Sequence, residues 1–101
     1  MDLVSWWAAV AADDVGPAAV KAKEYGSFDL LIIGRTLREA MDIGPDVVSD
    51  EEIGISFYLL GKISRAVSAI ASGQRPSDDT WHDITVFSMM ARRVRETGTW
   101  P

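Results

Sequence analysis

Apolar residues along this chain recur at spacings of three and four, and they never alternate with polar residues over the length of a strand. Such spacing predicts helices and no sheet. The first stretch, residues 3 to 12, is rich in alanine and follows Asp2, a residue type that favours helix N-termini. Gly16-Pro17 predicts the end of this helix, and Pro17 suits the first turn of a second helix to about Lys23.

A third helix is predicted over residues 28 to 41, with Ser27 in position to cap it. The segment Gly44-Pro45-Asp46 has the composition of a turn, so the chain is expected to leave the helical path there. The clearest helix start follows. Ser49 and Glu52 have the spacing of a capping box, in which each side chain accepts the backbone amide hydrogen of the other residue.

Two long helices are predicted in the C-terminal half. The first extends to about Ser72, with Gly73 as its left-handed C-terminal residue. The second is capped by Ser77 and extends to about Thr97, with Gly98 just beyond it. Because a short turn joins them, they are expected to be antiparallel. The sequence therefore predicts one all-α domain over residues 1–101, a bundle of four to five helices with two long antiparallel helices at its C-terminal end.

The long helix after Ser49 is apolar nearly all round, which is typical of the central helix of a bundle or an oligomer. Gly54 and Gly61 lie on one face of it, and each costs about 1 kcal/mol relative to alanine in a helix. We expect a closely approaching helix to offset that cost. The chain is also 48% hydrophobic with four tryptophans, more apolar material than 101 residues need. These features predict a homodimer or a larger homo-oligomer.

Charge and composition narrow the functional classes. A formal net charge of -5 argues against general binding of nucleic acids, because that affinity comes from Lys and Arg. The chain has no cysteine, which excludes disulfides and thiolate metal sites, and its single histidine removes most histidine metal sites. No run approaches the roughly 18 apolar residues that a membrane span requires, because charged residues such as Asp13, Lys21 and Arg35 interrupt every candidate. Asp2 stands where a signal peptide carries a basic residue. We therefore expect a cytoplasmic protein with no membrane partner.

Charged and polar residues form one stripe on each of the two C-terminal helices. At about 100° per residue, each of the following sets falls in a narrow band. The first set is Glu51, Tyr58, Lys62 and Arg65, and the second is Asp79, His82, Asp83 and Arg93. Because the helices are expected to be antiparallel, the two stripes can face each other or flank one groove.

Such a groove would suit the phosphates of a nucleotide. Carboxylates from two helices can hold Mg²⁺, which prefers oxygen ligands. Lys62 and Arg65 would neutralise phosphate oxygens, and His82 would donate a hydrogen bond to a phosphate or a base. A simpler interpretation stays open for each residue. The acids occupy first turns, where the helix dipole favours them, and Lys62 and Arg65 fit ion pairs with Asp79 or Asp83.

Three segments resemble small phage-encoded proteins of the MazG-like, nucleotide-modification-associated type. They are Lys23-Glu24-Tyr25-Gly26-Ser27, Gly61-Lys62-Ile63-Ser64-Arg65 and Asp78-Asp79-Thr80-Trp81-His82-Asp83-Ile84. The resemblance covers about residues 19 to 98. It implies an all-α dimer or tetramer that holds Mg²⁺ and a nucleoside triphosphate between helices. It also implies hydrolysis between the α and β phosphates, in the cytoplasm of an infected bacterium.

The resemblance also implies roles for individual residues. Asp79 and Asp83 resemble the family's metal-binding acids, Glu51 or Glu52 the acids that open the central helix, and Lys62 and Arg65 its phosphate contacts. Beside the resemblance, we expect Glu51, Glu52, Asp79 and Asp83 to hold the metal, Asp83 or Glu51 to act as the base, and His82 and Tyr58 to contact the nucleotide. The sequence departs from the family pattern at Ile55, where a third acid is expected, and in the four-residue spacing of Asp79 and Asp83. The alternative is a non-enzymatic helical phage protein that oligomerises and binds a host or phage protein.

Overall fold

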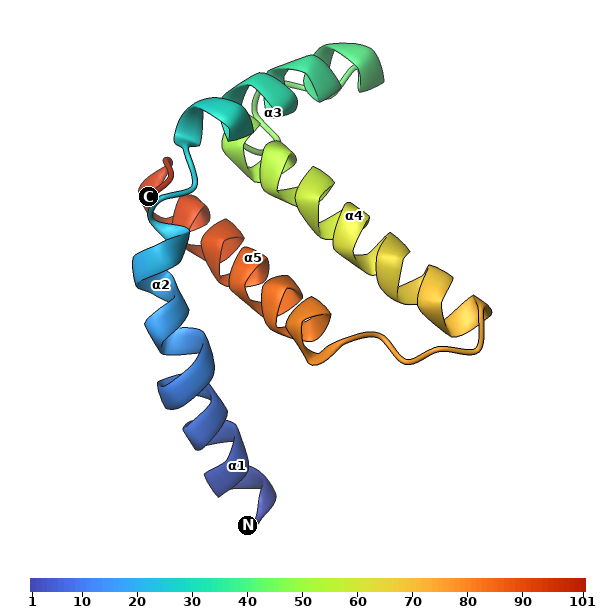
Figure 1. Ribbon diagram of the computed structural model, residues 1–101. Coiled ribbons are helices and arrows are strands. Elements are labelled where there is room, and N and C mark those ends of the chain that lie inside the picture. Colours follow the sequence, from blue (N-terminus) through green and yellow to red (C-terminus); the bar gives the residue numbers. More distant parts are fainter.

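The computed structural model describes residues 1–101 as helices and their connections. In order these are α1 (Leu3–Val10), a π-helical turn η1 (Ala11–Val15), α2 (Gly16–Ala22), α3 (Ser27–Met41), α4 (Asp50–Ala71) and α5 (Asp78–Thr97). The first three form one continuous rod, which we call the N-terminal arm, so the chain consists of four helical rods (Figure 1). The predicted all-α fold with two long C-terminal helices is confirmed.

The N-terminal arm does not break at Gly16-Pro17, where the sequence predicted an end. The amide of Gly16 donates to the carbonyl of Ala11, five residues back, which widens the helix at this point. Proline lacks an amide hydrogen and crowds the carbonyl four residues before it, so a widened turn lets the rod continue. Gly16 is required there, because a Cβ would lie 2.8 Å from the Ala11 carbonyl oxygen.

The predicted ends of the two long helices are confirmed. The Ser49 hydroxyl accepts the amide hydrogen of Glu52 at 3.2 Å. Ser77 caps α5 in the same way, and Gly73 and Gly98 have left-handed φ angles of 76° and 86°. Only half of the capping box forms, because the Glu52 carboxylate binds the guanidinium of Arg95 on α5 instead. At the start of α3, Gly26 rather than Ser27 occupies the capping position.

Helices α3 and α4 cross in direct backbone contact, which explains one of the two glycines of α4. A Cβ on Gly54 would lie 2.3 Å from the carbonyl oxygen of Leu30 on α3. Gly34 on α3 is equally constrained, since its Cβ would lie 1.6 Å from the carbonyl oxygen of Asp50. The close approach predicted at Gly54 is therefore confirmed. Gly61, one heptad further along the same face, has no atom within 4 Å of its ideal Cβ position.

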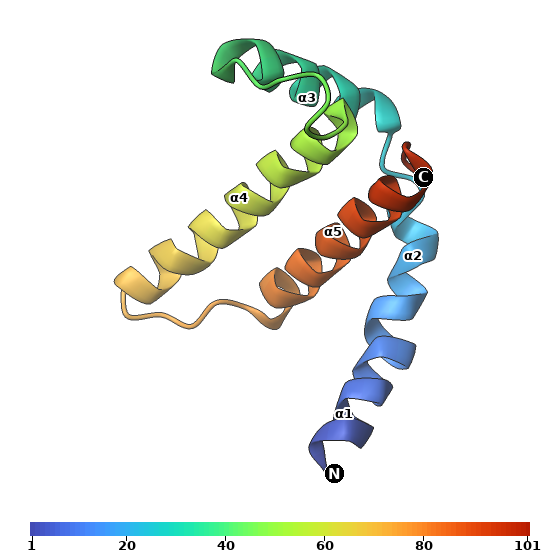
Figure 2. The same cartoon turned by 180° about the vertical axis from the view of Figure 1, so that it is seen from behind.

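The hydrophobic core lies where α5 passes between α4 and the N-terminal arm (Figures 1 and 2). Its largest fully buried side chains are Leu30, Ile55, Met90 and Val94. Tyr58 of α4 stacks on Phe87 of α5 with ring centroids 5.6 Å apart, and Tyr25 stacks on the same ring at 5.7 Å. This aromatic stack joins α4 to the segment that links the arm with α3.

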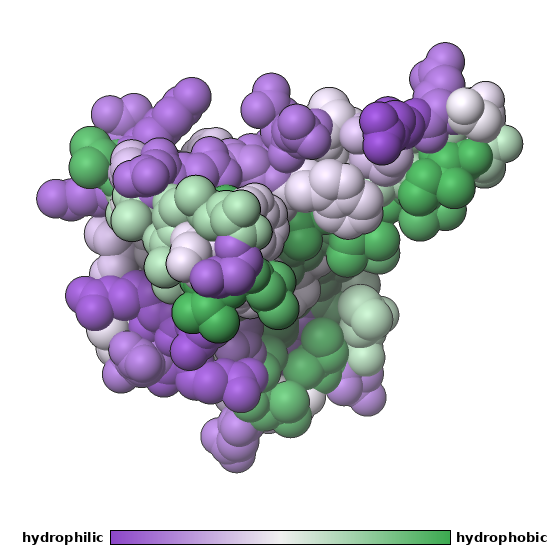
Figure 3. All heavy atoms as spheres, turned by 90° about the horizontal axis from the view of Figure 1, so that it is seen from below, coloured by the Kyte–Doolittle hydropathy of each residue, from purple (hydrophilic) through white to green (hydrophobic).

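The core is small for the size of the chain. Only 13 of 101 residues are buried. The radius of gyration is 15.3 Å, compared with about 13 Å for a compact domain of 100 residues. Figure 3 shows the consequence on one face, where hydrophobic residues are exposed beside a strongly hydrophilic side. The rods therefore leave much of their apolar surface without a partner inside the chain.

Candidate functional site

Lys62 and Asp83 form the centre of the charged surface between α4 and α5. The Lys62 Nζ lies 3.0 Å from Oδ2 of Asp83, and the two side chains remain 25% and 36% exposed. The antiparallel arrangement brings the middle of α4 beside the second turn of α5. The ion pair proposed for Lys62 is thus confirmed, with Asp83 as its partner.

Arg65 and Asp79 lie close to this pair without forming an ion pair of their own. Both side chains are exposed, and neither takes part in a salt bridge. Relative to Lys62 and Asp83 they are displaced along their helices by about 5 Å and 6 Å, at a rise of 1.5 Å per residue. The displacement is toward the connecting loop in both cases. One side of the hairpin therefore carries two basic and two acidic residues near one another.

The other two acids of the expected metal site lie at the opposite end of the hairpin. Glu51 is about 16 Å along α4 from Lys62, at a rise of 1.5 Å per residue. It is buried and accepts a hydrogen bond from the backbone amide of Trp100. Glu52 binds Arg95. No three potential metal-ligating side chains gather anywhere in the chain, so a single chain does not bring the four predicted metal ligands together.

His82 and Tyr58 have partners other than Lys62 and Asp83. The Nδ1 atom of His82 lies 3.0 Å from a carboxylate oxygen of Asp14 in η1, which joins α5 to the N-terminal arm. Tyr58 belongs to the aromatic stack in the core. The structure therefore gives both residues a packing role within the chain and leaves Lys62, Arg65, Asp79 and Asp83 as the sequence-predicted residues that share one side.

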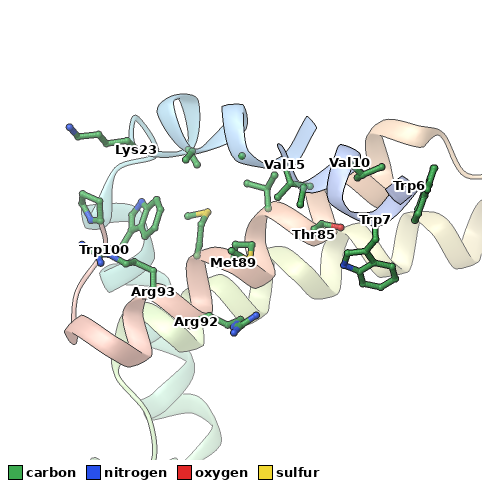
Figure 4. A pocket seen from close by; sticks show the side chains of 17 residues that line it. Trp6, Trp7, Val10, Val15, Lys23, Thr85, Met89, Arg92, Arg93 and Trp100 are labelled. Atoms are coloured by element: carbon green, nitrogen blue, oxygen red, sulfur yellow. The ribbon is translucent and has the colours of Figure 1, made fainter. Parts of the chain in front are cut away.

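A broad concave surface lies elsewhere, between the N-terminal arm and α5. This groove has a volume of about 900 Å³. Trp6, Trp7, Val10 and Val15 line it from the arm, and Met89, Met90, Arg92 and Arg93 line it from α5 (Figure 4). Trp100 closes one end, and its buried indole N–H has no acceptor. Sequence reasoning missed the groove, although the apolar character of residues 3 to 12 signalled an unburied face.

Comparisons with known proteins give no further guidance. No protein-family model, no curated protein and no solved structure matches this chain. The resemblance to MazG-like proteins therefore depends on the three quoted segments alone.

Proposed function

We propose that this chain is the subunit of a homo-oligomeric helical protein that acts by binding other protein chains, beginning with a second copy of itself through α4. The observation that carries the proposal is the vacant Gly61 at the midpoint of α4. A glycine in an exposed helix costs about 1 kcal/mol relative to alanine. At Gly54 that cost is offset by the crossing of α3. A second helix crossing at Gly61 would offset it in the same way.

The outer face of α4 has the side chains that such a crossing needs. Phe57 and Leu60 flank the side of Gly61 and are 50% and 65% exposed, and the exposed side chains of Val67, Ile63 and Ile70 continue the apolar surface around the helix away from Gly61. The small residues Ser64 and Ser68 continue the line of Gly61 along the helix. Because Gly61 lies at the middle of α4, an antiparallel copy of α4 that crosses there would place the first half of each helix against the second half of the other. A self-complementary surface of this kind is what a two-fold dimer requires.

The accessible surface of the chain supports the same conclusion. It measures 7265 Å², whereas a folded monomer of this mass exposes about 5,700 Å². The excess is about 1,600 Å² for each chain. A standard protein–protein interface buries about 800 Å² on each partner. An assembly that buries this excess would lower the exposed area of each chain to that of an ordinary folded protein.

A membrane is the competing partner for α4. By length and composition the helix is long and apolar enough to cross one, with a mean hydropathy of 1.3 over its best window, which corrects the prediction that no run approaches a membrane span. However, Lys62 and Arg65 lie within this helix, and a charged residue near the centre of a bilayer costs at least about 2.5–3.5 kcal/mol. Lys62 also has an ionic partner on a helix with many polar residues. These charges favour protein as the partner.

Light scattering on matched variants tests the proposal. Leu60→Asp places a charge on the outer face at a residue that is 65% exposed, so the fold of the chain should persist. Ala40→Asp places the same charge at an exposed position on α3. We expect Leu60→Asp to lower the mass of the assembly and Ala40→Asp to leave it unchanged. An unchanged mass for both variants, or co-flotation of the intact chain with lipid vesicles, would refute the proposal.

A nucleotide site is the second candidate, favoured by the grouping of Lys62, Arg65, Asp79 and Asp83 on one side of the hairpin. Basic residues beside acids suit a triphosphate with Mg²⁺, the ligand that the MazG-like resemblance implies. Asp79 and Asp83 are the acids available to a metal on this side, because Glu51 is buried against the Trp100 amide and Glu52 binds Arg95.

Pyrophosphate release from a panel of nucleoside triphosphates with Mg²⁺, combined with nucleotide-induced shifts in melting temperature, tests this candidate. Lys62→Ala and Asp83→Ala should fold and assemble but lose the nucleotide response. A part-exposed ion pair contributes only about 0–1 kcal/mol, so neither variant should unfold. Absence of both turnover and any melting shift in the intact protein would eliminate the nucleotide site.

A further inference from the structure

Helix α1 is an apolar helix without a partner in its own chain. None of its residues is buried, and Leu3, Val4 and Trp7 are 70%, 78% and 67% exposed. It lies against no element except η1, the next segment of the arm. Burying a large apolar side chain contributes about 1.5–3 kcal/mol. A helix that buries none of its apolar residues therefore gains substantially from any surface that covers it.

The groove between the N-terminal arm and α5 is such a surface. Eleven of its 17 lining residues are hydrophobic, and Trp7, Val10 and Met89 face the space between the two rods (Figure 4). No residue of α1 has its Cα within 8 Å of a Cα in α5 of the same chain. The rods therefore diverge toward the N-terminus, and the groove is widest where α1 is least covered.

The charges around the groove match those of the arm. Lys23, Arg92 and Arg93 line the groove, and none of them forms an ion pair within the chain. The segment before Lys21 carries three acids, Asp2, Asp13 and Asp14, and no basic side chain, and of these acids only Asp14 has an ionic partner in its own chain, His82. A second copy of the arm would thus bring negative charge to a groove with a positive rim, which favours this occupant over a neutral or basic helix.

We infer that two chains exchange their arms, so that α1 of each copy lies in the groove of the other. A two-fold axis then relates the two chains, and their rods form one layer of four. The order across this layer is α5, the partner's arm, the chain's own arm and the partner's α5. This contact is distinct from the α4 contact, because α5 separates the groove from α4 (Figure 1). The excess surface of about 1,600 Å² has room for both contacts, at about 800 Å² of each chain per interface.

Disulfide trapping provides a direct test, because the natural chain has no cysteine. One preparation carries Leu3→Cys and the other carries Met89→Cys; the residues are 70% and 51% exposed, so both variants should fold. A disulfide needs Cα atoms within about 7 Å, a condition that α1 and α5 of one chain do not meet. The control mixes Leu3→Cys with Asp46→Cys, whose cysteine lies in the connection between α3 and α4.

On mild oxidation, the Leu3→Cys and Met89→Cys mixture should yield several-fold more cross-linked heterodimer than the control mixture. Equal yields would overturn arm exchange and would leave a different protein or a small apolar ligand as the occupant of the groove. Repeating the mixture in the Leu60→Asp background separates the two proposals. Arm exchange predicts that the cross-link persists there. Loss of the heterodimer in that background would show that the groove contact depends on α4, and this result would also overturn arm exchange.

Discussion

Replacing Gly61 with alanine should have opposite effects on the isolated chain and on its assembly. In one chain, an alanine methyl group at this position meets open space, because no atom lies within 4 Å of the ideal Cβ. The substitution then only improves helix propensity, which stabilises an exposed helix by about 0.8–1.0 kcal/mol. In a dimer that crosses at this residue, two methyl groups would separate the helices. Overpacking of this kind costs about 1–3 kcal/mol.

The magnitude can be measured in two backgrounds. In the Leu60→Asp protein, where the α4 contact is removed, urea denaturation should show that Gly61→Ala raises the free energy of unfolding by about 1 kcal/mol. In the otherwise natural chain, sedimentation equilibrium should show α4-mediated association weakened about tenfold or more, since 1.4 kcal/mol corresponds to a factor of ten. The two effects have opposite signs and come from one methyl group.

Gly54→Ala is the matched control, because this residue lies on the same helix face and is already covered. Its Cβ would lie 2.3 Å from the carbonyl oxygen of Leu30, so the substitution should destabilise the chain in both backgrounds. A Gly61→Ala protein that is more stable but associates as strongly as the natural chain would rule out a helix crossing at Gly61.

Two further predictions concern the ends of the rods. Glu51→Ala should lower the free energy of unfolding by about 1–3 kcal/mol in urea denaturation, because it leaves the buried amide of Trp100 without its acceptor; a neutral effect would mean that water replaces the carboxylate. The backbone amide of Ser5 donates to Asp2 and lowers the pKa of that carboxyl group. A lowered pKa in the folded state means that the cap contributes above the ordinary pKa of Asp and is lost as the pH falls through the lowered value. Far-UV circular dichroism should show that this acid-dependent loss of helix is absent in Asp2→Ala, and an identical pH dependence in both proteins would contradict it.

Helix boundaries could be read from the sequence because local chemistry determines them. Ser49 and Ser77 cap their helices, and Gly73 and Gly98 end theirs, as predicted. Predictions that depended on a competing partner were wrong. Glu52 binds Arg95 from a distant part of the chain in preference to the nearby amide of Ser49. The continuous arm was also missed, because a π-helical turn that accommodates Pro17 leaves no clear signal in residue spacing.

The candidate site was harder to predict because it depends on how the two long helices align. Asp79 and Glu51 both occupy first turns, and the first turns of two antiparallel helices lie at opposite ends of the hairpin. A stripe on each helix therefore did not ensure that the acids would meet. Lys62 and Asp83 did meet, because one lies at mid-helix and the other lies one turn inside α5. The groove could not be predicted from the sequence, because it depends on the path of the N-terminal arm beside α5, which only the three-dimensional structure shows.

The mass of the intact chain in solution tests self-association most directly. Light scattering or sedimentation over a range of concentrations should give at least twice the chain mass of 11.1 kDa, with the mass falling in Leu60→Asp. A constant mass of one chain at every concentration would contradict the assembly proposed for α4 and, with it, the exchange of arms.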